Sequence, residues 1–349
     1  MKARMTPVEG WVRVVRFEEP ESGLDALIAI HDVTLGPACG GCRIRPYPRF
    51  EAALDDVTRL SRGMTYKNAL GGIPFGGGKA VINADPKTQK TESLLRAFGR
   101  AVESLEGLYY TAEDSGVTEH DLDIVRKETK YVAGLARAGE GGNPSPFTAR
   151  GVFRGVEAAA RFRLGRSNLS GLRVAVLGAG AVGMELCRLL HEAGARLTVA
   201  DVNAAAVDEA VRRFGAAAAA PDELVAADVD VFSPCALGGA INAQSIGRLR
   251  APVVAGAANN QLLTPDMDAA LRAKGVLYAP DYVINAAGVI SVGLEILDQW
   301  NAADLNARID RIGDTLTAIF DRSAREGRPT GEIADAMAMD VIAKAKRAA

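Results

Sequence analysis

The chain has 349 residues, of which 48% are hydrophobic and 24% are charged. At about 150 residues per domain, this length predicts two domains. The net charge of −2 provides no basic surface for nucleic acid or an acidic membrane. Four cysteines are too few for a disulfide framework, and no apolar run reaches the roughly 18 residues of a membrane span. Because no apolar segment follows the basic start of the chain, we expect no secretory signal and a cytoplasmic protein.

The first part of the chain mixes short strands with one clear helix. Apolar residues at helical spacing, from Leu54 to Met64, predict an amphipathic helix over residues 51–64. A stretch rich in glycine and proline, residues 139–146, predicts a linker and a domain boundary. The predicted strands are residues 12–17, 27–30, 79–83 and 108–111.

From residue 173 onward, β-rich runs alternate with helical patterns. This alternation predicts βαβ units and a parallel sheet, hence an α/β fold. The chain from Asp304 onward is helical by pattern. The predicted strands are residues 173–177, 196–201, 228–232, 252–256 and 276–280, and the helices between them include residues 184–193 and 204–214.

A glycine-rich turn follows the first of these strands and opens a helix. Gly178, Gly180 and Gly183 form the spacing GxGxxG, which favours dinucleotide binding over glycines that merely pack a turn. Asp201 ends the next strand, where a carboxylate can accept hydrogen bonds from ribose hydroxyls. No arginine follows it to bind a 2′-phosphate, so NAD is favoured over NADP. The cofactor-binding residues predicted here are Gly178, Ala179, Gly180, Ala181, Val182, Gly183, Asp201 and Val202.

Two lysines flank an earlier glycine-rich segment. Lys67 and Lys79 do not belong to a phosphate-binding P-loop, because Ile73 stands where that motif needs glycine. Glycines let a substrate and the backbone crowd a lysine, and a desolvated lysine can serve as a general base. The alternative is two solvated surface lysines. Asp114 follows a predicted strand, where it is either a functional group or a helix N-cap.

Eight segments of the chain resemble, in order, the motifs of the amino acid dehydrogenases. This family acts on glutamate, leucine, phenylalanine and valine, and the motifs most resemble those of the leucine dehydrogenases. The resemblance extends from about Leu35 to the C-terminal helices. The segments are LGPACGGCR, RGMTYKNALGGIPFGGGK, TAEDSG, GNPSPFTARGVFRG, GAGAVG, SPCALGGAIN, VVAGAANNQL and YAPDYVINAAGV.

The resemblance implies reversible oxidative deamination of an L-amino acid to a 2-oxo acid and ammonia, with NAD accepting the hydride. Lys67 matches the lysine that holds the substrate α-carboxylate, and Lys79 matches the catalytic lysine. Asp114 matches the residue that moves a proton at the amino nitrogen, and Asn260 matches a substrate contact. The residues matched to the nicotinamide half of the cofactor site are Thr148, Ala236, Asn259 and Asn285, and Cys235 and Ala258 are further predicted cofactor-binding residues.

The side-chain pocket implied by the resemblance is apolar. Cys39 stands where the glutamate enzymes carry a lysine, so a glutamate carboxylate would be buried without a partner. We expect leucine, valine or isoleucine, with phenylalanine or tryptophan as the alternative, because Cys39 and Ala133 depart from the usual leucine enzyme. The predicted substrate-binding residues are Cys39, Gly40, Gly41, Met64, Lys67, Ala112, Ala133, Asn260, Val289 and Val292.

The resemblance also implies three parts of the chain. Residues 1–138 form a substrate-binding α/β domain, and residues 139–322 form a doubly wound Rossmann domain. Residues 323–349 are helices that pack back on the first domain. The active site is expected in the cleft between the domains, in a homo-oligomer that is an octamer or smaller.

Two other functions stay open. A non-catalytic NAD-binding sensor or regulatory subunit would keep the fold, but would need neither lysine nor Asp114. A hydroxyacid dehydrogenase would need a histidine acid–base group, and no histidine lies in a suitable motif. Cys39 and Cys42 have CxxC spacing, but there is no second ligand pair for zinc, so we expect no metal.

Overall fold

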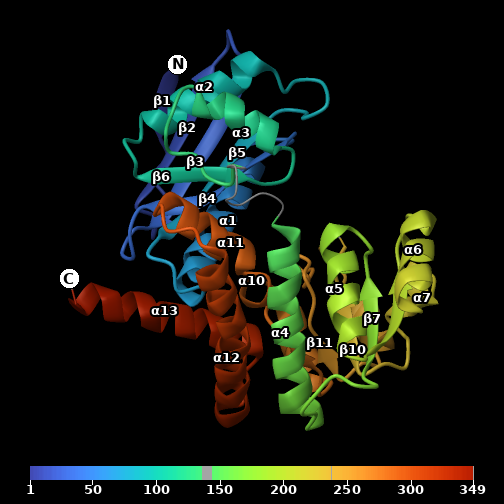
Figure 1. Ribbon diagram of the computed structural model, residues 1–349. Coiled ribbons are helices and arrows are strands. Elements are labelled where there is room, and N and C mark those ends of the chain that lie inside the picture. The colour runs from blue at the N-terminus through green and yellow to red at the C-terminus, as the bar shows by residue number, and fades with distance from the viewer. Residues whose placement is uncertain (136–143, 237, 349) are drawn as a thin grey trace. The chain divides into compact units, whose positions relative to one another are not determined.

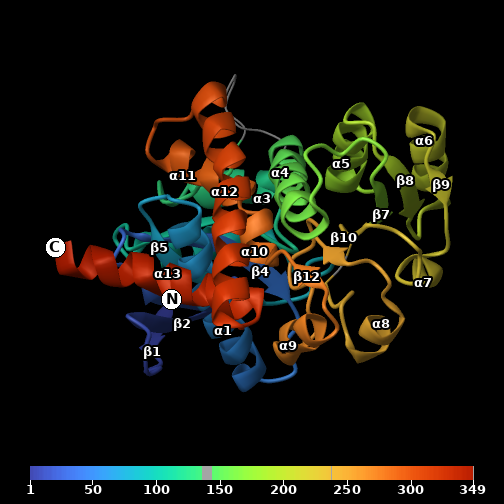
Figure 2. The same cartoon turned by 90° about the horizontal axis from the view of Figure 1, so that it is seen from below.

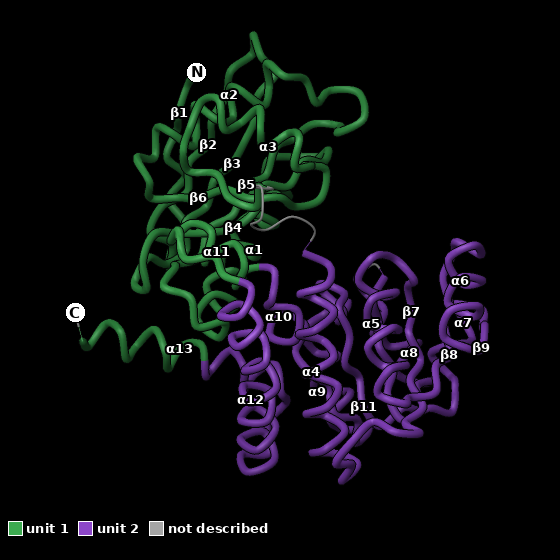
Figure 3. The backbone as a smooth tube through the Cα atoms, in the orientation of Figure 1, with its two compact units in different colours: residues 1–142, 289–301, 338–349 green, residues 143–288, 302–337 purple. Residues whose placement is uncertain are grey.

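The computed structural model describes residues 1–135, 144–236 and 238–348, which form two compact units (Figure 3). Unit 1 comprises residues 1–142, 289–301 and 338–349, and unit 2 comprises residues 143–288 and 302–337. Most of the predicted linker, with the boundary at residue 139, lies outside the described residues. Its last two residues begin the helix α4 (Ser145–Leu164).

The units differ from the three contiguous segments expected from the sequence, because two late segments return to unit 1. The helix α11 (Ala287–Ile296) contributes residues 289–296, and a Cβ built on Gly293 would lie only 3.1 Å from Ile73. The helix α13 (Thr330–Ala348) contributes its second half, where Ala338 and Ile342 pack in one cluster with Ala69. Residues 323–337, which were expected to pack on the first domain, belong to unit 2.

Unit 1 is a six-stranded sheet with helices on both faces (Figure 1). Its strand order is β1-β2-β3-β5-β4-β6, in which β4 is parallel to both neighbours and the other pairs are antiparallel. The strands are β1 (Lys2–Met5), β2 (Arg13–Glu19), β3 (Leu24–Asp32), β4 (Ala38–Arg45), β5 (Gly76–Asn83) and β6 (Tyr109–Glu113). The helices are α1 (Phe50–Leu70), α2 (Glu92–Glu103) and α3 (Glu119–Arg126).

The strands of unit 1 alternate between two cores. Ile28 of β3 packs in a cluster with Phe98 of α2, whereas Leu27 packs on the other face in a cluster with Val57 of α1. This alternation follows from the two-residue repeat of a strand. All four strands predicted in this part exist, and the predicted helix extends to Leu70. The strands β1 and β4 were not predicted.

Unit 2 has a fully parallel sheet with the strand order β12-β11-β10-β7-β8-β9 (Figure 2). In chain order this is 3-2-1-4-5-6 read from β9, the order of a dinucleotide-binding sheet, with its switch point between β7 and β10. The strands are β7 (Arg173–Leu177), β8 (Arg196–Ala200), β9 (Ala217–Ala218), β10 (Val231–Pro234), β11 (Val253–Val254) and β12 (Leu277–Tyr278). The helices besides α4 are α5 (Ala181–Glu192), α6 (Ala204–Phe214), α7 (Pro221–Leu224), α8 (Ala243–Arg248), α9 (Asp266–Ala273), α10 (Asp281–Ile284) and α12 (Ala302–Glu326).

A buried carboxylate fixes the start of α13 within unit 2. Asp268 of α9 is 6% exposed and accepts a hydrogen bond of 2.7 Å from the backbone N–H of Gly331. The hydroxyl of Thr330 donates to the carbonyl of Tyr278. Burial raises the pKa of Asp268 to about 6, despite hydrogen bonds that oppose the shift. Across the described ranges, no helix is long and apolar enough to cross a membrane.

Candidate active site

A buried ion pair joins two of the predicted catalytic residues in unit 1. Lys79 lies within β5 and is 7% exposed, so it is not a solvated surface lysine. Its Nζ lies 2.5 Å from Oδ2 of Asp114, the residue that directly follows β6. Asp114 is not a helix N-cap, because Thr118 caps α3. The glycine-rich segment therefore leads to a desolvated lysine paired with a carboxylate.

The ion pair passes over β4, which lies between β5 and β6. This strand has glycines where the two charged side chains approach each other. A Cβ built on Gly41 would lie 2.4 Å from the carbonyl oxygen of Glu113 and 3.0 Å from Cβ of Asp114. Both distances are below ordinary contact, so only glycine leaves room for Asp114 at this position.

The surroundings of Asp114 favour its ionised form. Its Oδ1 accepts a hydrogen bond of 2.6 Å from the N–H of Ser115, and Oδ2 faces Lys79 and the guanidinium of Arg43, whose Nη2 is 3.5 Å away. Burial alone would raise the pKa of Asp114. The charges of Lys79 and Arg43, together with the hydrogen bonds, outweigh burial and hold this pKa below its usual value.

Arg43 is a residue of the site that the sequence interpretation missed. It lies on β4, two residues after Gly41 and therefore on the same face of the sheet. Its Nη1 donates to Asp56 of α1 at 3.1 Å. Asp56 also accepts hydrogen bonds from the hydroxyl of Tyr47 at 2.8 Å and from Arg59 at 3.0 Å. The motif GGCR contains the signal, but only a strand assignment for β4 shows that Gly41 and Arg43 point the same way.

The end of α1, which carries Lys67, is fixed to the sheet. Asn68 is fully buried, and its Nδ2 donates to the carbonyl of Gly76 at 2.6 Å and to that of Cys39 at 3.3 Å. A Cβ built on Gly77 would lie 2.1 Å from the backbone nitrogen of Thr65, so α1 packs directly on β5. Lys67 is half-buried in the last turn of α1, and these contacts set the position of its backbone.

The predicted substrate-pocket residues in unit 1 gather around the same strands. Cγ of Met64 would lie 3.0 Å from a Cβ built on Gly40. Cys39 and Ala112 are buried in β4 and β6. Ala133 is also buried, and its N–H donates to the carbonyl of Thr111 in β6. Apolar or small side chains of the predicted pocket therefore lie beside α1 and β5, the elements that carry Lys67 and Lys79.

Helix α11 is tied to the loop that carries Ala133. The carboxylate of Glu295 accepts hydrogen bonds from the backbone N–H groups of Gly134 at 2.8 Å and Leu135 at 3.3 Å. Val289 and Val292, three residues apart on α11, lie on one face of the helix. Glu295 thereby holds together two segments that supply predicted pocket residues.

The two CxxC cysteines differ in position. Cys42 belongs to the core cluster on the α2 face of the sheet, whereas Cys39, three residues earlier on β4, faces the other side. Burial raises the pKa of Cys39 to about 12, and the nearby charge of Lys79 only partly offsets this effect. Both cysteines are free thiols. Within the described ranges, no group of three histidine, cysteine or acidic residues could hold a metal ion.

The glycine-rich turn of unit 2 has the shape that a dinucleotide needs. Gly178 has φ of +107°, and a Cβ built there would lie 2.7 Å from the nitrogen of Ala236. A Cβ on Gly183 would lie 1.9 Å from the carbonyl oxygen of Gly178. Gly180 differs, because nothing lies within 4 Å of its Cβ position and it begins α5 without a side-chain cap. An open backbone and uncapped N–H groups at a helix N-terminus fit a pyrophosphate. Ala179, Ala181 and Val182 complete this turn.

An acidic side chain follows the next strand of the sheet. Oδ2 of Asp201 accepts a hydrogen bond of 2.6 Å from the N–H of Ala179, and Oδ1 accepts one of 2.8 Å from Asn203. Val202 beside it is 97% exposed. The carboxylate thus lies against the glycine-rich turn, at the carboxyl edge of the sheet where nucleotides bind.

Polar residues that follow β11 and β12 in the chain lie at the same edge of the sheet. Nδ2 of Asn285 donates to Oδ1 of Asn259 at 2.7 Å and to the carbonyl of Ala257 at 3.1 Å. Asn260 has a positive φ of 52° and accepts a backbone hydrogen bond from Gly239. Asn260 belongs to unit 2, whereas the other predicted substrate-binding residues belong to unit 1. The remaining predicted cofactor residues of unit 2 are Thr148 at the start of α4, Cys235 and Ala236 after β10, and Ala258 after β11.

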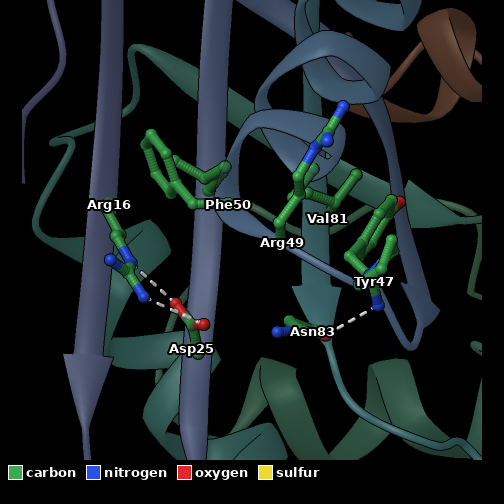
Figure 4. Close-up of a pocket in the computed structure, with 10 residues that line it drawn as sticks. Arg16, Asp25, Tyr47, Arg49, Phe50, Val81 and Asn83 are labelled. Atoms are coloured by element: carbon green, nitrogen blue, oxygen red, sulfur yellow. Dashed lines mark hydrogen bonds and ion pairs between the residues drawn. The ribbon is translucent and has the colours of Figure 1, made fainter.

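A separate cavity of about 140 Å³ opens in unit 1 on the α1 face of the sheet (Figure 4). Phe50, Val81 and Tyr47 line it, together with the paired side chains of Arg16 and Asp25. None of the predicted site residues lines this cavity.

Unit 2 has the strand order of a dinucleotide-binding sheet, and unit 1 contains a lysine–carboxylate pair with little solvent exposure; these features are typical of a nucleotide-dependent oxidoreductase. Residues 12–131 match the family described as Glu/Leu/Phe/Val dehydrogenase, dimerisation domain. Residues 199–349 match the Glutamate/Leucine/Phenylalanine/Valine dehydrogenase family. The chain belongs to this family of amino acid dehydrogenases.

Individual relatives agree with the family match. The chain is 47% identical over 336 residues to a leucine dehydrogenase from Bacillus subtilis, covering 96% of this chain and 92% of that protein. It is 48% identical over 325 residues to an L-tryptophan dehydrogenase from Nostoc punctiforme, covering 93% and 91%. A crystal structure of L-tryptophan dehydrogenase from Nostoc punctiforme superimposes with a TM-score of 0.87 at 46% identity, over 97% of each chain. The predicted family and fold class are confirmed.

Proposed function

We propose that the protein catalyses the reversible, NAD-dependent oxidative deamination of an apolar L-amino acid to its 2-oxo acid and ammonia. Leucine, valine and isoleucine are the preferred substrates. The observation that carries the proposal is the buried pair of Lys79 and Asp114, 2.5 Å apart. A non-catalytic nucleotide sensor would gain nothing from desolvating these two charges, which costs free energy.

The proposed roles follow from the chemistry of each side chain. Lys67 binds the α-carboxylate and orients Cα, which is worth several orders of magnitude in rate. Asp114 takes a proton from the amino group as the imino acid forms. Lys79 activates the water that attacks the imino carbon and stabilises the oxygen that gains charge. At 2.5 Å, the two groups are in direct hydrogen-bond contact, so Asp114 orients the Lys79 side chain for this role.

The proposed cofactor is NAD, which accepts the Cα hydride when bound. Gly180 and the first turn of α5 would hold the pyrophosphate, because this backbone is open and uncapped, and Gly178 permits the tight turn before them. Asp201 binds the ribose hydroxyls and repels a 2′-phosphate, which favours NAD over NADP. Asn259 and Asn285 hold the nicotinamide half.

The pocket supports an apolar substrate side chain. Cys39 is 2% exposed and carries a neutral thiol, so it offers no cation to a glutamate carboxylate. Burying that carboxylate unpaired would cost several kcal/mol. The second candidate is an aromatic substrate, which the similarity to an L-tryptophan dehydrogenase favours. A homo-oligomer, octameric or smaller, and a cytoplasmic location complete the proposal.

The test is NADH oxidation with ammonia and a panel of 2-oxo acids: 4-methyl-2-oxopentanoate, 3-methyl-2-oxobutanoate, phenylpyruvate and 2-oxoglutarate. We expect the branched aliphatic acids to react fastest. Turnover of 2-oxoglutarate alone would overturn the pocket argument, and NADH binding without turnover of any acid would favour the sensor. Replacing Lys79 by alanine should abolish turnover while NADH binding, measured by fluorescence titration, stays near the parent value. Retained turnover would remove Lys79 from the mechanism.

A further inference from the structure

Arg43 bridges the buried carboxylate of Asp56 and the partly buried carboxylate of Asp114 with the two ends of one guanidinium. Its Nη2 lies 3.5 Å from Oδ2 of Asp114, and its Nη1 lies 3.1 Å from Oδ2 of Asp56. The side chains of Arg43 and Asp56 are 14% and 10% exposed. Removing charges from water this far is costly unless each is paired. A core that needed only apolar packing would not require this arrangement.

We propose that Arg43 is a positioning residue for the deamination: it holds Asp114 in place and keeps this carboxylate ionised. This inference rests on the proposed role of Asp114 in catalysis. Arg43 acts on the reaction through Asp114, and Asp56 fixes the guanidinium from the opposite side. A planar, forked group suits this task, because it can face two carboxylates at once, whereas a lysine ammonium is a single point charge.

The charges around Asp114 come from the three adjacent strands. Lys79 faces it from β5, and Arg43 and Cys42 lie near it on β4. On β6, the neighbouring titratable groups are Tyr109 and Glu113. Burial raises the pKa of Cys42, Tyr109 and Glu113, so the first two are neutral. Lys79 and Arg43 are therefore the cations that oppose protonation of Asp114.

Asp56, the carboxylate on the side of Arg43 away from Asp114, accepts hydrogen bonds from two further donors. The hydroxyl of Tyr47 donates to Asp56, and burial together with this hydrogen bond raises the pKa of Tyr47, so it remains a donor. Tyr47 also lines the cavity of Figure 4, where its backbone N–H donates to Asn83. Arg59 is the second donor, and its side chain is 53% exposed. Its ion pair is with Asp56, so it is linked to Asp114 only through Asp56 and Arg43.

The consequence for the reaction is a dependence on pH. The acid limb of kcat/KM reports protonation of groups that the free enzyme needs unprotonated. A cation beside Asp114 lowers the proton affinity of that carboxylate. Without Arg43, Asp114 binds a proton more tightly, so activity is lost at a higher pH.

The experiment is the pH profile of kcat/KM for L-leucine and NAD in Arg43→Gln and in the parent enzyme. We expect the acid limb to move upward by about 1 to 3 pH units, as for an aspartate that loses an arginine partner. The KM for leucine should change less than kcat, because Arg43 is placed behind Asp114. An acid limb at the parent position in folded Arg43→Gln overturns the proposal.

A second variant decides the matter if Arg43→Gln does not fold. Arg43→Lys keeps a positive charge but loses the fork, so we expect the acid limb within a few tenths of a pH unit of the parent and a kcat about ten- to a hundredfold lower. Parent kcat in Arg43→Lys overturns the positioning role. The matched control is Arg59→Gln, which removes the other arginine from Asp56 and should leave the acid limb unmoved.

Asp114→Asn, measured in parallel, separates this inference from the proposed function. If Asp114→Asn keeps parent turnover, the proposed role of Asp114 fails, whatever Arg43 does. If Asp114→Asn loses turnover while Arg43→Gln keeps the parent acid limb, only the inference about Arg43 fails.

Discussion

Replacing Gly41 by alanine adds one methyl group beside the Lys79–Asp114 pair. The new Cβ would lie 2.4 Å from the carbonyl oxygen of Glu113, which is about 1 Å short of an ordinary contact of roughly 3.5 Å. This carbonyl belongs to the residue before Asp114, so relieving the clash moves the carboxylate by a similar distance. The added methyl therefore acts directly on the geometry of the ion pair.

Two magnitudes follow for Gly41→Ala. Overpacking a well-filled core costs about 1–3 kcal/mol, which should lower the melting temperature. A displacement of about 1 Å at a catalytic group can reduce kcat by about a hundredfold. NADH binding should not change, because the glycine-rich turn belongs to the other unit.

The assay is kcat for leucine oxidation together with the melting temperature. Gly63→Ala is the matched control, since nothing lies within 4 Å of its Cβ position in the interior of α1. This control should keep parent activity and gain up to about 1 kcal/mol from helix propensity. Parent kcat and melting temperature in Gly41→Ala would refute the argument that a glycine is required there.

Three further changes can be tested in the same way. Gly180→Ala should keep the parent melting temperature but weaken NADH binding in a fluorescence titration, whereas Gly183→Ala should lower the melting temperature itself. Equal behaviour of the two variants would contradict the proposed pyrophosphate site at the glycine-rich turn. Asn68→Ala removes the side-chain donor to two buried carbonyls, so we expect the free energy of unfolding to fall by about 1–3 kcal/mol and the KM for leucine to rise. An unchanged KM would show that Asn68 does not position Lys67 for substrate binding. The pKa of Asp268 is raised to about 6 in the folded protein, against 3.8 ordinarily. The folded protein therefore binds this proton more tightly than the unfolded chain, which raises the free energy of unfolding by at most about 3 kcal/mol. This stabilisation is complete below about pH 4 and is lost as the pH rises through 6. Asp268→Asn should remove this pH dependence from melting temperatures measured between pH 4 and 8. If the melting temperatures of the variant and the parent depend on pH in the same way, Asp268 is not the source of the dependence.

Much of the parallel sheet could be predicted because its strands are buried on both faces. The strand 173–177 is found residue for residue, since such strands appear as short, continuous apolar runs. The helix 204–214 is also found as predicted. In contrast, β4 contains two glycines and ends in charged residues, which weakens a strand signal. The sequence pattern also cannot say which core an apolar helix joins, as α11 illustrates.

The candidate site, too, could be predicted only in part. Glycines near Lys79 predict crowding, and the structure shows this side chain buried. The position of Asp114 after a strand was also predicted. The link from Asp114 through Arg43 to Asp56 depends on the register of β4 and on a helix that starts five residues after it. Such contacts between distant residues leave no periodic mark in a single sequence.

The construction of unit 1 from separate stretches of chain affects how the protein can fold during synthesis. Ala69 packs with Ala338 and Ile342, so the N-terminal sheet and α1 emerge from the ribosome well before their last neighbours. Translating the roughly 270 residues between Ala69 and Ala338 takes about 13–54 s. During this interval the nascent chain carries uncovered apolar surface beside Leu35, Tyr66 and Leu70. We therefore expect chaperones to bind the growing chain, and a shortage of them to reduce the soluble yield more than it reduces the stability of molecules that finish folding.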